Sequence, residues 1–445
     1  MFLYSEIKKD AHKVTFVVNP ELSKYFIDNF WYESEQLPEK LPEAIAVIPL
    51  LANVAPVIWL FGLNVTIKEC DEVFFNALAK WKSVLKSLWP NKEWAGEINC
   101  EKLINFRNLE ATNEVDNPKS VMLFSGGLDS VTTLMRHKDE NPTLLCIRGA
   151  DCDLEDLDRW ATFVENTNQV ATSLNCLSTF VSSNFRVFLN RELLDHYVKQ
   201  MGGKDWWLSI QHGWGLLSFL VPISETSAMV KGYIASSNHL EDLYASGSRP
   251  DSDEAFESSL FGGGHITIAH DGVELHRFEK LDYLYQLMQQ KLEIPPVRVC
   301  LRSFSGGNNC CTCEKCARTI ASILAIGCSQ PDMFGFDEYT KFGENWNQIF
   351  IRNVMKGRHS MRADWVALQK IIRERDWYLE HGLKEYQIEF LEWVKNLDID
   401  QINKRKAERS KHRTPEWLKR LTPSSKVLVP AKLRLLWNRI KDSYF

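Results

Sequence analysis

The sequence predicts an α/β fold built on a doubly wound parallel sheet. Apolar, strand-like runs recur at residues 121–124, 143–147, 177–182 and 230–235, with helical patterns between them. Such alternation is typical of parallel strands that are covered by helices on both faces. Two further features lie at the ends of this region. A glycine pair follows the first strand, and closely spaced cysteines follow the last.

The length of 445 residues predicts two or three domains. The alternating pattern and both motifs fall within residues 119–330, which we expect to form the central domain. Residues 1–118 are expected to form a small N-terminal α/β domain. Residues 331–445 are expected to form a helical C-terminal extension that closes with a basic tail, and residues 386–394 have the pattern of an amphipathic helix.

The N-terminal block contains three informative segments. Residues 13–18 have the pattern of a strand, and residues 72–89 that of an amphipathic helix. Residues 44–67 form a charge-free apolar run that is long enough to span a bilayer. Two prolines and an asparagine interrupt it, so we interpret it as buried core strands joined by a turn.

Charge is distributed unevenly along the chain. The net charge is −5, yet residues 401–445 hold 13 Lys/Arg against 3 Asp/Glu, which gives this tail +10 and the rest of the chain −15. A basic tail on an acidic body can contact nucleic acid or an acidic protein; a solvated helical face is the alternative. The N-terminus lacks the pattern of a signal peptide, so we expect a cytoplasmic protein with reduced cysteines and no membrane association.

The glycine pair belongs to the motif Ser125-Gly126-Gly127-Leu128-Asp129-Ser130. Glycines let successive main-chain N–H groups point into one concavity, and the following helix adds the positive end of its dipole. Ser125 and Ser130 can donate hydroxyl groups to the same anion, so the motif predicts a pyrophosphate site. Asp129 would cap the helix or hold Mg²⁺ against the phosphates. An ordinary strand-to-helix turn is the alternative.

The cysteines have the spacing Cys-x9-Cys-x2-Cys-x2-Cys, formed by Cys300, Cys310, Cys313 and Cys316. Four thiolates at this spacing suit tetrahedral Zn²⁺, and a site filled by four cysteines leaves no open position for catalysis. Cys311 is an extra thiol that could replace Cys310 as a ligand. Clustered buried thiols or a redox pair are the alternatives.

Together, the two motifs resemble the 7-cyano-7-deazaguanine synthases (QueC), a family of PP-loop ATP pyrophosphatases with an adenine nucleotide alpha hydrolase-like fold. The resemblance covers residues 119–330. It implies ATP and Mg²⁺ as cofactors, with a deazaguanine-like acid and ammonia as small-molecule partners. The added N- and C-terminal blocks are similar to those of extended members in bacterial anti-phage systems, including the QatC type, where they would dock a partner protein.

The resemblance also implies roles for single residues. The segment after residue 235 is similar to the family's substrate loop, with candidate contacts at Asn238, Asp242, Arg249 and Asp251. Residues 274–281 resemble a short strand that ends in a lysine-bearing helix start, so Lys280 or Arg277 would neutralise charge at the α-phosphate. Turn chemistry and a surface ion pair are the respective alternatives. One departure is that Gln211-His212-Gly213 stands where the family has an Arg-Asn pair, which makes His212 a candidate donor.

The implied reaction is ATP-dependent adenylation of a carboxylate on a 7-deazaguanine-like acid, followed by amide or nitrile formation. Three alternatives remain at this point. The activated acid could be joined to an amine of a protein or nucleic acid, or the chain could be a non-catalytic ATP-sensing subunit. A PP-loop tRNA thiolase would need reactive thiols near ATP, for which Cys146 and Cys152 are the candidates.

Overall fold

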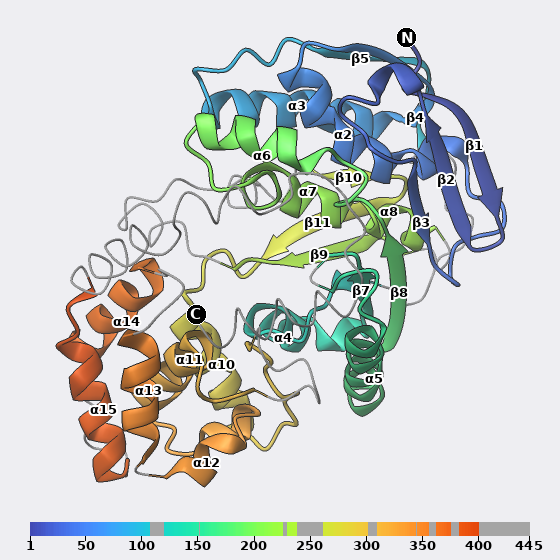
Figure 1. Cartoon of the computed structure of the whole chain (residues 1–445). Coiled ribbons are helices and arrows are strands. Elements are labelled where there is room, and N and C mark those ends of the chain that lie inside the picture. Colours follow the sequence, from blue (N-terminus) through green and yellow to red (C-terminus); the bar gives the residue numbers. More distant parts are fainter. Residues whose placement is uncertain are drawn as a thin grey trace, which may run out of the picture.

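The computed structural model (Figure 1) describes residues 1–106, 120–150, 152–225, 229–237, 261–300, 309–343, 345–355, 362–374 and 382–399. The expected substrate residues Asn238, Asp242, Arg249 and Asp251 lie outside these ranges, as does the basic tail at residues 401–445.

A nine-stranded mixed sheet forms the centre of the molecule, in the order β1-β2-β3-β8-β7-β6-β9-β11-β10. Neighbouring strands from β8 to β11 are parallel, and the strands at both edges are antiparallel. The predicted strand runs are confirmed as β6, β7, β8 and β9. The bounds are β1 Tyr4–Asp10, β2 Lys13–Val18, β3 Phe30–Glu33, β6 Ser120–Leu123, β7 Thr143–Arg148, β8 Leu177–Ser183, β9 Lys231–Ala235, β10 Gly262–Gly263 and β11 Ile266–Asp271.

Helices cover both faces of this sheet, because alternate side chains of its strands enter two different cores. Val121 of β6 belongs to one core and the next residue, Met122, to the other. The core around Val121 is closed by α2 (Ile48–Leu60), α3 (Glu72–Leu88), α6 (Arg191–Gln200), α7 (His212–Leu217) and α8 (Leu220–Ser224). The core around Met122 is closed by α4 (Leu128–Arg136), α5 (Leu157–Ser173) and α10 (Arg277–Gln289).

The N-terminal block is continuous with the central sheet. β3 pairs with β8, matching Tyr32 with Ser183. Trp81 of α3 stacks on Trp214 of α7, with ring centroids 4.0 Å apart. The predicted strand at residues 13–18 and helix at residues 72–89 are confirmed as β2 and α3, and β4 (Asn64–Asp71) pairs with β5 (Glu97–Ile104) in a separate two-stranded sheet. The first 106 residues therefore share one hydrophobic core with the central sheet.

The strand interpretation of residues 44–67 is wrong. The segment forms α1 (Glu43–Ala46), α2 and only then β4. Every residue of α2 from Ile48 to Trp59 is buried, so the helix has no polar face that would reveal a helical period. A continuous apolar run does not distinguish a buried strand from a buried helix. Pro49 is tolerated because it lies in the first turn of α2.

The described part of the C-terminal extension is helical, as predicted. α11 (Glu314–Ala325) packs against α13 (Asn345–Met355), α14 (Arg362–Glu374) and α15 (Glu385–Lys395), and α12 (Glu338–Phe342) lies beside α13. α15 confirms the amphipathic helix expected at residues 386–394. The described residues also contain short helical turns: 3₁₀ helices at Pro20–Leu22, Lys138–Glu140 and Pro331–Phe334, and a π-helix at Trp207–Gln211.

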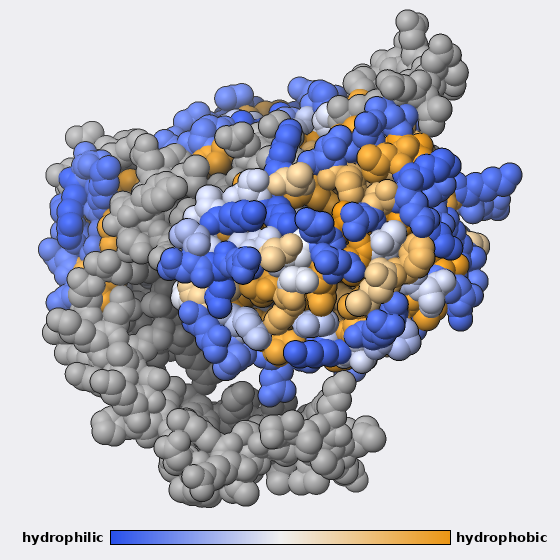
Figure 2. All heavy atoms as spheres, turned by 90° about the horizontal axis from the view of Figure 1, so that it is seen from above, coloured by the Kyte–Doolittle hydropathy of each residue, from blue (hydrophilic) through white to orange (hydrophobic). Residues whose placement is uncertain are grey.

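Within the described residues, no helix is long and apolar enough to cross a membrane. The surface in Figure 2, seen from above, instead mixes apolar with hydrophilic side chains. Exposed large apolar residues of the N-terminal block are Met1, Phe2, Ile27 and Leu103.

Candidate functional site

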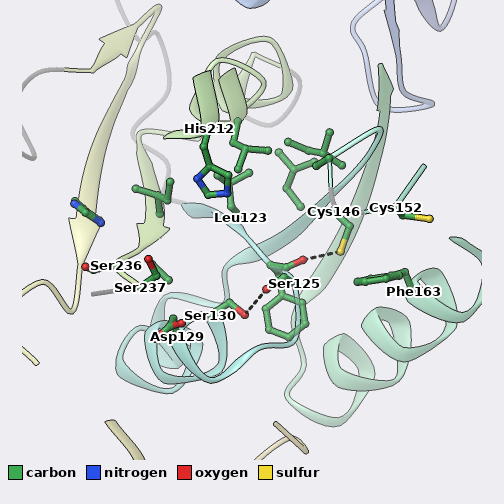
Figure 3. A pocket seen from close by; sticks show the side chains of 18 of the residues that line it. Leu123, Ser125, Asp129, Ser130, Cys146, Cys152, Phe163, His212, Ser236 and Ser237 are labelled. Carbon is green, nitrogen blue, oxygen red and sulfur yellow. Dashed lines mark hydrogen bonds between the residues drawn. The ribbon is translucent and has the colours of Figure 1, made fainter. Parts of the chain in front are cut away.

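The Ser-Gly-Gly-x-Asp-Ser segment forms a tight loop between β6 and α4. Gly126 has φ +70°, a left-handed conformation that favours glycine. The N–H of Gly127 donates to Ser125 Oγ over 3.4 Å, and Ser130 Oγ donates to Gly127 O over 3.2 Å. The two serine hydroxyls lie 3.4 Å apart (Figure 3). The loop thus gathers hydroxyl groups at the N-terminus of α4, where unpaired N–H groups and the helix dipole attract an anion.

The loop lies at the point where the order of the parallel strands reverses. β7 and β8 follow on one side of β6, whereas β9 and β11 lie on the other. In doubly wound sheets, ligands bind at the carboxyl ends of the strands at such a switch point. A cavity of about 200 Å³ opens here and is lined by Ser125, Asp129, Ser130, Ser236 and Ser237 among others (Figure 3).

The rest of the cavity wall is largely apolar. Leu145, Ile147 and Ile234 come from the strands, and the rings of Trp160 and Phe163 come from α5. Apolar walls with a few polar groups are typical of pockets for small molecules. The cavity could therefore take a small molecule with an apolar face next to the loop at Ser125–Ser130.

Asp129 lies in the first turn of α4 and has two cationic partners on α10. Its carboxylate is 2.9 Å from Arg277 Nη1 and 3.0 Å from Lys280 Nζ. Burial alone would raise the pKa of Asp129, but the charges of Arg277 and Lys280 outweigh burial and lower it. Asp129 is therefore ionised at neutral pH and lines the cavity.

Arg277 and Lys280 lie in the first turn of α10, which is the lysine-bearing helix start that the resemblance implies. The short strand expected just before it is absent from the described residues there, because β11 already ends at Asp271. Lys280 is 1% exposed and also donates to Ser236 O. Neither side chain lines the cavity. Both side chains hold the Asp129 carboxylate in place through ion pairs, so they act as positioning residues.

His212 lines the cavity from the face opposite the loop, as Figure 3 shows. It begins α7, directly after the π-helix at Trp207–Gln211. Gln211 is buried and donates to Asn53 of α2 over 2.7 Å and to Phe185 O over 2.9 Å. The N-terminal block thus fixes the segment that carries His212. The two neighbouring residues have separate roles, since Gln211 is structural and His212 faces the cavity.

Cys146 and Cys152 also line the cavity, but both thiols are protonated at neutral pH. Burial raises the pKa of Cys146 to about 11, and its S–H donates to Phe124 O over 2.8 Å. Burial likewise raises the pKa of Cys152. Because the thiolate is the reactive form, these surroundings disfavour the sulfur chemistry that a thiolase requires.

Arg298 contacts the loop as well, although no motif in the sequence marks it. Its main-chain N–H donates to Gly126 O over 2.7 Å, and its guanidinium donates to Ser125 O over 3.2 Å. A Cβ at Gly126 would lie 3.1 Å from two guanidinium nitrogens, so a larger residue there would have to shift the Arg298 side chain by a few tenths of an ångström. The one sequence signal is the position of Arg298 two residues before Cys300.

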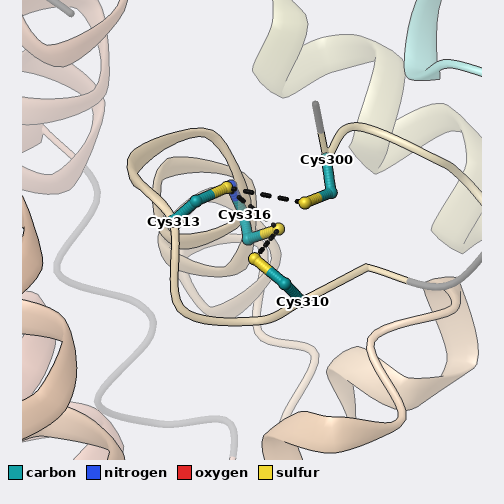
Figure 4. A group of neighbouring side chains, drawn as sticks. All are labelled: Cys300, Cys310, Cys313 and Cys316. Carbon is teal, nitrogen blue, oxygen red and sulfur yellow. Dashed lines mark hydrogen bonds between the residues drawn. The ribbon is translucent and has the colours of Figure 1, made fainter. Parts of the chain in front are cut away.

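The four predicted zinc ligands converge. Sγ atoms of Cys300, Cys310, Cys313 and Cys316 all lie within 4.8 Å of one another (Figure 4). Three of the Sγ–Sγ distances are 3.4 to 3.9 Å, and tetrahedral Zn²⁺ with Zn–S bonds of about 2.3 Å places its sulfurs about 3.8 Å apart. The donor set therefore fits Zn²⁺, and its four thiolates would fill the coordination sphere.

Cys311 is turned away from this centre. Its S–H donates to Asn309 O, and burial raises its pKa to about 12. Its carbonyl accepts from Trp346 Nε1 over 2.8 Å, which ties the loop to α13. The alternative between Cys310 and Cys311 is thus resolved in favour of Cys310.

Three comparisons were made with known proteins. No protein-family model, no curated protein and no solved structure matches the chain.

Proposed function

We propose that this chain is an ATP-dependent adenylating enzyme that activates the carboxylate of a 7-deazaguanine-like acid for amide or nitrile formation. The observation that carries the proposal is the loop at Ser125–Ser130, which gathers anion donors and the ionised Asp129 at the edge of a cavity. The location at the strand switch point and the apolar opposite wall support a nucleotide and a ring acid as ligands. The resemblance of the two motifs to 7-cyano-7-deazaguanine synthases supplies the reaction type.

The proposed chemistry begins with a substitution at phosphorus. A carboxylate oxygen attacks the α-phosphorus of ATP, the bond to the bridging oxygen breaks, and pyrophosphate leaves. Ammonia then attacks the acyl-adenylate, AMP leaves, and one proton is released as the amide forms. A second adenylation on the amide oxygen, followed by loss of AMP and a proton, would give the nitrile.

The chain's own residues would bind and orient the reactants. Main-chain N–H groups at the start of α4 and the hydroxyls of Ser125 and Ser130 would bind phosphate oxygens. Arg277 and Lys280 keep Asp129 ionised and fixed, so that it can hold Mg²⁺, whose charge would offset that of the phosphates. The four-cysteine centre would bind Zn²⁺ in a structural role.

The test is incubation with ATP, Mg²⁺, ammonia and 7-carboxy-7-deazaguanine, followed by mass analysis of the products. We expect AMP, pyrophosphate and an amide or nitrile from the unmodified chain. Asp129→Asn should slow pyrophosphate release by about 100-fold or more, because the metal-binding charge is lost. Asp158→Asn is the matched control, since Asp158 is also the second residue of a helix that follows a strand of the same sheet, but it is exposed and away from the cavity.

Each other outcome has a distinct meaning. A deazaguanine-tagged protein or nucleic acid would change the acceptor but keep the adenylation. ATP binding without AMP formation, under every combination of acid and amine, would contradict the proposal and favour a sensing subunit.

A further inference from the structure

Arg298 is held against the phosphate loop by its main chain and by its side chain. The main-chain bond to Gly126 O fixes its backbone, and the guanidinium bond to Ser125 O orients its side chain. The guanidinium carbon lies 4.6 Å from the centre of the Phe163 ring, within the range of a cation–π contact. The charge is therefore fixed in place next to the loop.

The segment that carries Arg298 is itself clamped. The side chain of Asn309 is buried and accepts from the N–H groups of Val299 and Cys300, while it donates to the carbonyls of Val297 and Gly335. The amide oxygen thus accepts two hydrogen bonds and the amide NH₂ group donates two, which is the full capacity of the side chain. Arg298 is thus preorganised by a small network that adjoins the four-cysteine centre.

Arg298 differs from Arg277 and Lys280, the other cations near the loop, in its ion pairing. Arg277 and Lys280 are both paired with Asp129, whereas no carboxylate in the described part of the chain lies within ion-pair distance of Arg298. A fixed guanidinium with no carboxylate partner among the described residues, beside a loop rich in anion donors, is suited to a phosphate, which it can bind through two parallel N–H groups.

The position of Arg298 also indicates which phosphates it would meet. The proposed acid binds in the cavity on the Asp129 side of the loop, so the α-phosphate must face that cavity. Arg298 and Gly126 instead line a separate groove of about 470 Å³, and Phe124 borders both spaces. The loop therefore separates the reacting side from the side on which Arg298 lies.

We propose that Arg298 binds the β- and γ-phosphates of ATP and the pyrophosphate that leaves. This assignment rests on the proposed function in taking ATP as the ligand. Charge builds up on the leaving oxygen as the bond to the α-phosphorus breaks, and a fixed guanidinium on that side stabilises it. Binding of pyrophosphate does not depend on which acid or amine is used.

The experiment measures dissociation constants by calorimetry for α,β-methylene-ATP, inorganic pyrophosphate and AMP, each with Mg²⁺. Arg298→Gln should weaken binding of the ATP analogue and of pyrophosphate by about tenfold or more, and change AMP binding by less than about twofold. Arg298→Lys should fall between the two. Arg159→Gln is the matched control, because Arg159 also lies over the Phe163 ring, at 5.7 Å, while its main-chain N–H donates to Asp156 at the start of α5.

A second measurement uses the unmodified chain, so it does not depend on the folding of a variant. Phenylglyoxal labels arginines, and mass spectrometry maps the sites. Pyrophosphate should protect Arg298 and leave Arg159 labelled. Equal loss of AMP and ATP-analogue affinity in Arg298→Gln, unchanged affinity, or no protection of Arg298 would each overturn the assignment. The binding and labelling experiments contain no carboxylic acid substrate. Their outcome is therefore independent of whether the chain forms AMP in the assay of the proposed function.

Discussion

The loop at Ser125–Ser130 contacts segments that lie far apart in the chain, whereas the four-cysteine centre is formed within residues 300–316. Asp129 contacts Arg277 and Lys280, which lie 148 and 151 positions away, and Gly126 contacts Arg298. In the cysteine centre, three of the four ligands lie within seven consecutive residues. The first arrangement depends on the topology of the sheet, and the second on local spacing.

The two sites also differ in how they use charge. The loop opens into a cavity, and its charges are partly balanced, so an anion can still be attracted. The cysteine centre packs its thiols together. Cys300 raises the pKa of Cys310, but S–H groups of Cys313 and Cys316 outweigh this effect and lower it to about 6. One thiolate already forms readily there, as a metal site requires. The comparison suggests a ligand site at the loop and a structural site at the cysteines.

The largest expected effect is loss of the metal. Cys313→Ala removes one of four ligands and also the side chain that caps the N-terminus of α11. We expect zinc affinity to fall by about 100-fold or more, and the helices packed on α11 to lose stability. Zinc content and thermal unfolding followed by circular dichroism measure both changes.

Cys311→Ala is the matched control for this variant. Cys311 is buried in the same loop but its sulfur is turned toward Asn309, so zinc should remain stoichiometric. Equal zinc loss in both variants would contradict the assignment of Cys310 as the ligand. It would also show that the four cysteines do not differ from the neighbouring Cys311 in binding the metal.

An intermediate effect is expected from Lys280→Met. This change leaves the largely buried Asp129 with Arg277 as its one remaining ion-pair partner among the described residues, so the free energy of unfolding should fall by about 3 kcal/mol. Lys231→Met is the control, because Lys231 pairs with Glu140 on the surface and should cost less than about 1 kcal/mol. Urea unfolding measures both. Similar values would show that the Asp129 pair behaves like a surface ion pair.

The same contrast explains how much could be predicted from sequence. The spacing of the cysteines and the Ser-Gly-Gly-x-Asp-Ser motif are local, so Cys300, Cys313 and Asp129 could be selected from residue order alone. Arg298 could not, since its role depends on a contact made across the fold. The helix α2 was predicted as strands because full burial removes the period that distinguishes the two. Local chemistry was predictable, and long-range pairing was not.

The smallest expected effect is on stability and comes from His137, at the C-terminal end of α4 and away from the cavity. His137 follows α4, and its Nε2 is 3.1 Å from Asp271. The hydrogen bond that His137 donates to Asp271 raises the pKa of His137; burial opposes this shift, and Glu140, 3.4 Å away, adds to it. Arg136 also pairs with Asp271, and the His137 ring stacks on Tyr233.

Because the folded pKa of His137 is raised, its charged form contributes stability that is complete below the ordinary value of 6.5 and is lost as the pH rises through the folded value. The unmodified chain should exceed His137→Gln in unfolding free energy by about 1 kcal/mol at pH 5.5, and by less at pH 8.5. His196→Gln is the control, since that imidazole contacts Gln200 rather than a carboxylate. Urea unfolding at both pH values measures these differences in unfolding free energy. A difference that stays constant would show that His137 acts through packing on Tyr233 rather than through its charge.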